Sequence, residues 1–156
     1  MSKIEFYVSN KGIVFERDLI NSKAYMSLKG KSAPVLGIIM CRRKFDRQKH
    51  KIRGKSILTF INNGKIKLVY QEMKKKYGIS NYQFSRAIDE LCDYGFTDVN
   101  SVYNETIQRY EINFTLLHNY KDYGSDKFKP GKRQKSPTFF NKDKQKRDSR
   151  GRFIRI

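Results

Sequence analysis

The sequence predicts a mixed α+β fold organised around two helices joined by a tight turn, within residues 71–95. A basic helical run over 71–77 stops at Gly78, and a second helix is expected over 81–94 because its apolar residues recur at helical spacing. A nearly wholly apolar helix is expected at about 33–44 and should form the centre of the core. Segments in which apolar and polar residues alternate lie on both sides of the helix pair and predict strands.

The second helix of the pair has one apolar face and one polar face. A short side chain that carries an oxygen, Ser80 or Asn81, can cap its first turn, and Gly95 supplies a left-handed stop. Two helices joined by a tight glycine-containing turn form a helix-turn-helix unit, whose second helix enters the major groove of DNA. The apolar face consists of Phe84, Ala87, Ile88 and Leu91. The polar face consists of Tyr82, Gln83, Ser85, Arg86, Asp89 and Glu90.

The chain before the helix pair predicts two strands and two helices. Residues 3–8 alternate well enough for a strand or an extended arm, and 13–15 continue as a second short strand. The spacing of apolar residues over 16–28 is helical. Ser32 is expected to cap the helix at 33–44, with a proline tolerated in its first turn.

Two pairs of strands are expected, one on each side of the helix pair. Residues 57–61 and 66–70 flank an Asn-Asn-Gly triplet, and Asn-Gly is the strongest short signal for a β-hairpin. Residues 96–99 and 107–114 should pair as a wing around a loop at 100–106. Two helices, a hairpin, the helix pair and the wing have the order of elements of a winged helix-turn-helix with an extra β-hairpin.

The chain is strongly basic, with 34 Lys plus Arg against 15 Asp plus Glu and a formal charge of +19. Such an excess favours a polyanion as partner and carries no sequence specificity by itself. Residues 42–55 hold eight Lys or Arg and a single acid, Asp46, which predicts a loop that contacts phosphates. Residues 121–156 hold 13 Lys or Arg, four Asp and few aliphatic residues. We therefore expect a disordered basic C-terminal tail after a DNA-binding domain at 1–120.

Several kinds of chemistry lack the residues that they need. Cys41 and Cys92 fall inside predicted helices without a Cys-x-x-Cys pair and are expected to be buried reduced thiols. His50 and His118 are far apart and have no ligand residues at zinc-site spacing. The Gly-Lys-Ser at 54–56 lacks the upstream glycine of a phosphate-binding loop. We therefore expect no enzymatic activity, no metal or other cofactor, and no small-molecule ligand.

Membrane association is not expected either. No apolar run is long enough to cross a bilayer, and the N-terminus has no signal-peptide core. No strongly apolar amphipathic helix supports binding to an acidic membrane surface. The expected location is the cytoplasm, which is the host cytoplasm if the chain is viral.

Three spaced motifs carry a resemblance to a known family. They are S-K-A-Y-x-S-L at 22–28, N-N-G-K-I-x-L at 62–68, and Y-G-I-S-x-x-x-F-S-R-A-I-D-E-L-x-x-Y-G-F at 77–96. Together they resemble winged helix-turn-helix proteins of phages, plasmids and other mobile elements, which are often described as replication-initiation or regulatory proteins. The segment Y-K-D-Y-G-S-D-K-F at 120–128 resembles the stretch after the wing in some of those proteins. The resemblance covers about residues 15–128.

The resemblance implies that the exposed face of the second helix reads base pairs. The base-reading residues are then Asn81, Tyr82, Ser85 and Arg86. The residues expected at the DNA backbone are Arg42, Arg43, Lys44, Arg47, Lys49, Lys51, Lys74, Lys75, Lys76, Ser80, Arg109, Lys132 and Arg133. The wing departs from the family pattern, because its loop at 100–106 has no Lys or Arg. The run at 42–55 or the tail is expected to supply the missing backbone contacts.

The expected function is sequence-specific binding of double-stranded DNA, by a transcriptional regulator or a replication-origin binder of a mobile element. One alternative is an RNA-binding or ribosome-associated protein, which would explain the charge and the aromatic tail without base readout. Another is a winged helix that serves as a protein-interaction or replisome-loading module. A homodimer is common among such DNA readers, but no heptad seam is visible, so the oligomeric state stays open.

Overall fold

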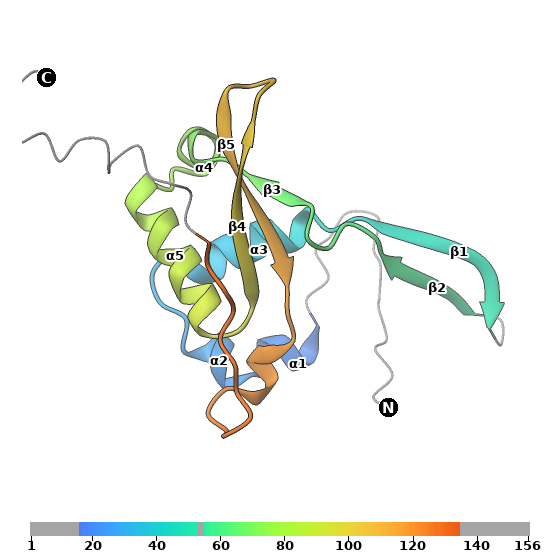
Figure 1. Ribbon diagram of the computed structural model, residues 1–156. Helices are drawn as coiled ribbons and strands as arrows, with labels where there is room; N and C mark the ends of the chain where they lie inside the picture. The colour runs from blue at the N-terminus through green and yellow to red at the C-terminus, as the bar shows by residue number, and fades with distance from the viewer. Residues whose placement is uncertain (1–15, 53–54, 135–156) are drawn as a thin grey trace, which may run out of the picture.

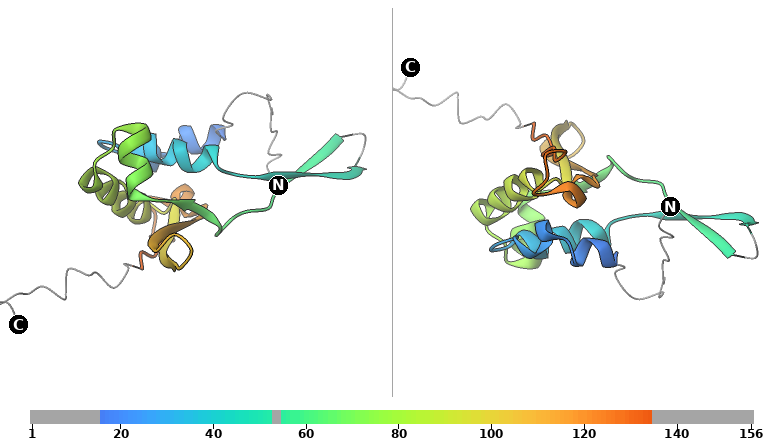
Figure 2. Two further views of the ribbon diagram at one scale, coloured as in Figure 1. Left: turned by 90° about the horizontal axis from the view of Figure 1, so that it is seen from above. Right: turned by 90° about the horizontal axis from the view of Figure 1, so that it is seen from below.

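The structure is a computed structural model that describes residues 16–52 and 55–134, with side chains described for 16–45 and 60–134. It is an α+β fold in which helices lie on one side of a three-stranded antiparallel sheet (Figures 1 and 2). The strands expected at 3–8 and 13–15 lie outside the described residues.

The sheet consists of β3 (Ile66–Leu68), β5 (Arg109–Leu116) and β4 (Thr97–Asn104), in that spatial order. The central strand β5 pairs antiparallel with both neighbours, so that Phe114 lies opposite Ile66 on one side and Val99 on the other. Because side chains alternate along a strand, the buried residues share one face of the sheet. They are Ile66, Leu68, Thr97, Val99, Ile112 and Phe114.

Three helices cover this face: α3 (Ser32–Cys41), α4 (Tyr70–Tyr77) and α5 (Asn81–Asp93). The expected apolar helix is α3, which packs against α5 at the centre of the core. A short 3-10 helix, η1 (Asn119–Asp122), comes after β5 and buries Tyr120. The four apolar residues predicted on the inner face of α5 are all buried: Phe84, Ala87, Ile88 and Leu91.

The helix pair α4 and α5 agrees with the sequence prediction. Gly78 ends α4 in the left-handed region, with φ of 65°. The Ser80 hydroxyl accepts a hydrogen bond from the Gln83 amide at 3.2 Å, and the Gln83 side chain accepts one from the Ser80 amide at 3.0 Å. This reciprocal capping box satisfies two amides of the first turn. Gly95 ends α5 with φ of 79°, as expected.

The first helical segment is broken, so the prediction of one helix over 16–28 is wrong. Two short helices replace it, α1 (Arg17–Ile20) and α2 (Lys23–Met26). Ser22 separates them, because its hydroxyl accepts a hydrogen bond from the Tyr25 amide at 3.1 Å and so caps α2. Serine competes for backbone groups in this way and favours helix starts over helix interiors.

The apolar helix α3 begins one residue earlier and ends three residues earlier than the expected 33–44. Its N-cap is Lys31, and the hydroxyl of Ser32 donates to the Glu90 carboxylate instead of capping the helix. Residues 42–44 then lead into a strand, which a prediction from local periodicity did not detect.

That strand belongs to a separate two-stranded hairpin of β1 (Phe45–Ile52) and β2 (Lys55–Phe60). It projects from the body on the side opposite α5 (Figures 1 and 2). The prediction of a loop at 42–55 is therefore wrong for most of that segment. The hairpin expected between 57–61 and 66–70 is also wrong, because β2 pairs with β1 and β3 pairs with β5.

The Asn-Gly turn forms, although it does not join paired strands. The Lys65 amide donates to the Asn62 carbonyl at 3.0 Å, and Gly64 has φ of 77°. The turn connects two separate sheets, and the side chains of Asn62 and Asn63 hydrogen-bond to backbone outside the turn.

Strand β4 is longer than the expected 96–99, and β5 begins and ends two residues later than the expected 107–114. Residues 105–108 connect them, in place of the predicted loop at 100–106. The Asn104 side chain accepts hydrogen bonds from the amides of Thr106 and Ile107, at 3.0 and 3.4 Å. The pairing continues out to Asn104 and Arg109, where side chains on both faces of the wing are exposed or half-buried.

Residues 121–134, which the sequence assigns to a disordered tail, are held against the body. We call residues 128–134 the strap. The backbone N–H and C=O of Val99 both hydrogen-bond to the strap, each at 2.8 Å, and the Gly131 amide donates to the Cys92 carbonyl at 2.7 Å. Composition did not predict this, because the contacts use the backbone edge of β4 and little apolar surface of the segment itself. Residues 135–156 lie outside the described residues.

Candidate nucleic-acid interface

The N-terminal half of α5 presents three of the four predicted base-reading residues at the surface. Asn81 begins the helix and is exposed, and Tyr82 is 69% exposed. Arg86 lies one turn further on, and its Nη1 donates to the Tyr82 hydroxyl at 3.1 Å, with the guanidinium 5.8 Å from the ring centre. This hydrogen bond raises the pKa of Arg86. The hydrogen bond fixes the Arg86 guanidinium relative to Tyr82. A guanidinium has five N–H donors, so several remain for a ligand.

Ser85, the fourth predicted base reader, is bound by Arg133. The Nη1 and Nη2 of Arg133 donate to the carbonyl and the hydroxyl of Ser85, both at 3.0 Å. The same guanidinium forms an ion pair with Asp89, and the Arg133 side chain is only 15% exposed. Both Ser85 and Arg133 therefore hold the strap on α5 in this structure. No signal in the sequence indicates this contact.

Glu90, on the same polar face, joins α5 to the start of α3. Its carboxylate accepts hydrogen bonds from the Lys29 amide at 3.2 Å and from the Ser32 hydroxyl. A carboxylate beside the start of a helix also interacts favourably with the helix dipole. Much of the polar face beyond Arg86 therefore stabilises the fold.

Lys74, Lys75 and Lys76 are exposed in the last turn of α4, directly before the turn that leads to α5. Their positive charges complement the C-terminal end of the α4 dipole. The sequence prediction of a backbone-contacting cluster stays compatible with this position. The Ser80 hydroxyl, by contrast, already accepts the Gln83 amide in the capping box.

The basic residues after α3 differ sharply in their surroundings. Arg43 forms an ion pair with Glu16 at 2.8 Å, and its side chain is only 5% exposed. Arg42 forms an ion pair with Glu72 and donates to the Lys67 carbonyl at 3.1 Å. Both arginines thus have structural contacts within the body. Lys44 is exposed. Arg47, Lys49 and Lys51 lie on β1, and their side chains are outside the described residues.

Three large apolar side chains are exposed at or near the tip of the wing. Val102, Tyr103 and Ile107 are 44%, 47% and 46% exposed. Arg109 is exposed at the start of β5, as the nearest cation to the tip in sequence. Lower on the wing, Lys67 forms an ion pair with Glu111 at 2.9 Å, and the hydrogen bonds from Lys67 and Asn104 lower the pKa of this carboxyl.

Lys132 is exposed on the strap, and its amide donates to the Asp98 carboxylate at 2.6 Å. Because Arg133 contacts α5, the end of the strap lies beside that helix. The predicted base-reading helix and the basic strap are therefore neighbours.

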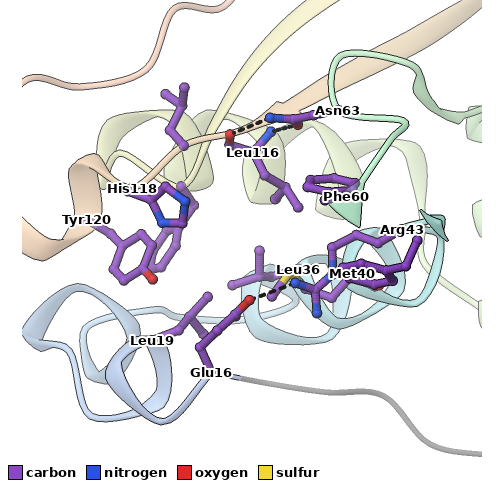
Figure 3. A pocket seen from close by; sticks show the side chains of 13 residues that line it. Glu16, Leu19, Leu36, Met40, Arg43, Phe60, Asn63, Leu116, His118 and Tyr120 are labelled. Atoms are coloured by element: carbon purple, nitrogen blue, oxygen red, sulfur yellow. Dashed lines mark hydrogen bonds and ion pairs between the residues drawn. The ribbon is translucent and has the colours of Figure 1, made fainter. Parts of the chain in front are cut away.

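A cavity of about 150 Å³ lies at the base of the β1–β2 hairpin, and no residue of α5 lines it. Figure 3 shows the Glu16–Arg43 ion pair on one side of it and the hydrogen bonds between Asn63 and Leu116 on the other. Its lining is mostly apolar and consists of Glu16, Leu19, Leu36, Met40, Arg43, Phe45, Phe60, Asn63, Phe96, Leu116, Leu117, His118 and Tyr120.

Both cysteines are free thiols, and the expectation that both are buried is wrong for Cys41. Cys41 is exposed, whereas burial raises the pKa of Cys92 to about 11. Within the described ranges, no group of three His, Cys, Asp or Glu side chains is arranged to hold a metal ion. In that same part of the chain, no helix has the length and apolar character needed to cross a membrane.

Comparison of the chain with protein-family models, with curated proteins and with solved structures found no match. The function is therefore inferred from the residues and geometry of α5 and its surroundings.

Proposed function

We propose that the chain is a winged-helix protein that binds double-stranded DNA sequence-specifically, as a transcriptional regulator or as a replication-origin binder of a mobile element. The order α3, β3, α4, α5, β4, β5, with the sheet order β3-β5-β4, supports the winged-helix assignment. In such a fold α5 is the helix that enters the major groove. The formal charge of +19 supplies attraction to the duplex.

The observation that carries this proposal is the exposed N-terminal half of α5. It combines a satisfied capping box with Asn81, Tyr82 and Arg86 at the surface. Asn pairs well with adenine and Arg with guanine in the major groove, and the N-terminal residues of a recognition helix are the ones that contact base edges. Lys74, Lys75 and Lys76 lie just before this helix and are available to phosphates.

The test is selection of bound sequences from random duplex DNA, for the wild type and the Arg86→Ala variant. A base-reading Arg predicts a sharp consensus for the wild type and loss of preference at one position in the variant. Each good bidentate contact is worth about 1–3 kcal/mol of discrimination, so the affinity for the consensus should fall roughly tenfold to a hundredfold. The matched control is Arg17→Ala, an exposed arginine on α1. Binding without any consensus, unchanged by Arg86→Ala, would contradict the proposal.

A second candidate is a protein-interaction or replisome-loading module. The exposed apolar side chains at or near the tip of the wing favour it, because many winged-helix DNA readers place cations there and this wing carries Val102, Tyr103 and Ile107. It predicts weak and featureless binding to every duplex in the same selection.

A further inference from the structure

Hydrogen bonds from two asparagine side chains join the base of the β1–β2 hairpin, which we call the root, to the body. The Asn62 side chain accepts from the Lys44 amide at 2.7 Å and donates to the Arg42 carbonyl at 2.9 Å. Asn63 makes the corresponding pair of hydrogen bonds with the backbone of Leu116, at 2.7 and 3.1 Å. These four bonds join the end of α3, the end of β2 and the end of β5. They set the direction in which the hairpin leaves the body.

Aromatic and ionic contacts strengthen this root. The rings of Phe45 and Phe60 are 5.7 Å apart, and the Ile61 amide donates to the Lys44 carbonyl at 3.0 Å. Arg43 lies 5.3 Å from the centre of the Phe45 ring and forms a part-buried ion pair with Glu16. These contacts hold the base of the hairpin in one position relative to the body.

Beyond the root, β1 and β2 pair with each other and leave the body (Figure 1). A two-stranded hairpin without a core to pack on is marginally stable in water, so its pairing is expected to gain from a partner. The sequence of the two strands indicates which partner. They contain Arg47, Lys49, Lys51 and Lys55 against one acid, Asp46. A two-stranded β-ribbon also fits the major groove of DNA.

The position of the hairpin relative to α5 indicates whether both contact the same duplex. The hairpin and α5 lie on opposite sides of the body in every view (Figures 1 and 2). A duplex bound at α5 therefore lies on the other side of the body from the hairpin. We propose that the β1–β2 hairpin binds a second segment of double-stranded DNA, so that one molecule bridges two duplex segments. The inference rests on the proposed function for its first duplex, and the hairpin supplies the second contact.

A bridging assay tests this directly. A duplex that carries the selected sequence is fixed to beads, the full chain is added, and capture of a second, fluorescent duplex is measured. Affinity for a single duplex in solution is measured in parallel by fluorescence anisotropy. The hairpin variant replaces Arg47, Lys49, Lys51 and Lys55 with Gln. A matched control removes the same charge from exposed lysines elsewhere, by replacing Lys23, Lys29, Lys31 and Lys127 with Gln.

We expect the hairpin variant to capture about tenfold less of the second duplex, because four phosphate contacts and their counterion release are lost. Its affinity for a single duplex should stay within about threefold of the wild type, as should both properties of the control. A second variant keeps Phe45 and Phe60, which are cross-strand partners at the root, and joins them by Asn-Gly in place of residues 46–59. It should lose capture in the same way.

Other outcomes overturn the inference in distinct ways. Unchanged capture by both hairpin variants excludes the hairpin as the second contact. A parallel fall in single-duplex affinity places hairpin and α5 on one duplex. A dimer in sedimentation that the hairpin variants convert to a monomer assigns the hairpin to a second copy of the chain. If the wild type binds one duplex and captures no second duplex, the bridging inference is wrong and the proposed function stands. If capture depends on the hairpin but shows no sequence preference, only the proposed sequence-specific function is wrong.

Discussion

At the scale of single residues, the polar face of α5 divides into two parts. Asn81, Tyr82 and Arg86 face solvent, whereas Asp89 and Glu90 bind the strap and the start of α3. Helical spacing places all of these residues on one side of the helix and does not distinguish a ligand contact from a tertiary one. The distinction comes from partners far away in sequence, such as Arg133, which lies 48 residues after Ser85.

The capping box at Ser80 gives the first prediction at this scale. Replacing Ser80 with Ala removes the acceptor of the Gln83 amide and should lower the free energy of unfolding by about 1 kcal/mol. The measurement is chemical denaturation followed by circular dichroism. Thr106→Ala is the control, since this exposed side chain in the wing loop should change stability by less than about 0.5 kcal/mol. Equal stability of the two variants would show that the box contributes nothing.

At the scale of elements, the strap explains how a basic segment with little apolar content becomes ordered. Tyr123 packs against Tyr94 and Phe128, with ring centres 4.7 and 5.3 Å apart. The strap then lies along the outer edge of β4, where Val99 pairs with it. The edge of a sheet offers unpaired backbone groups, so a short segment gains hydrogen bonds there without a core of its own.

Gly131 gives the prediction for this element. A Cβ at position 131 would collide with the backbone carbonyl of Thr97, so no side chain fits there. We expect Gly131→Ala to displace the strap and to lower the free energy of unfolding by about 1–3 kcal/mol. Limited proteolysis should then cleave the strap faster than in the wild type. The control is Lys129→Ala, an exposed strap residue whose backbone contact is kept. Similar proteolysis rates for the two variants would refute the tight fit.

At the scale of the whole molecule, the charge of +19 is distributed over surfaces with different roles. Arg42, Arg43 and Arg133 are used within the body, in ion pairs with Glu72, Glu16 and Asp89. The helix pair α4–α5 and the β1–β2 hairpin lie at separate places on the molecule (Figure 1), whereas the strap lies beside α5. A net charge therefore overstates the number of cations that any one duplex can meet.

Salt dependence measures that number for the proposed interface. Replacing Lys74, Lys75 and Lys76 with Gln should reduce the slope of log affinity against log salt concentration by up to about 3, because each lost phosphate contact releases about one counterion fewer. The selected sequence should not change, since these residues precede the reading helix. The control replaces Lys23, Lys29 and Lys31 with Gln, which removes the same charge from exposed positions outside the interface. An equal change of slope in both variants would show that only net charge acts.

Much of the helix pair and of its surface could be predicted from the sequence. The helix stops at Gly78 and Gly95 and the helical spacing of apolar residues are local signals, and each is present in the structure. Ser80 caps α5, which is one of the two caps that the sequence allowed, and the Gln83 half of its capping box was not predicted. Exposure of Asn81, Tyr82 and Arg86 is a consequence of the same period. Their role in reading bases stays a prediction.

The sheet and the surfaces around it could not be derived in this way. Residues 57–70 contain two strand-forming runs and an Asn-Gly turn. The two runs do not pair with each other, because the first pairs with the preceding strand β1 and the second pairs with β5. Strand pairing depends on which backbone edge is free and which face is buried, and both depend on distant segments. The same reason explains why Arg43, part of a basic run in the sequence, became a buried partner of Glu16.

The sequence by itself therefore determined the two helices of residues 70–93, their turn and the excess of positive charge, because those depend on neighbours within a few positions. Only the tertiary structure decided which cations stay at the surface, where the strap lies, and that the basic hairpin leaves the side opposite α5. The physical reason is that ion pairs and strand edges are satisfied by partners brought close by folding.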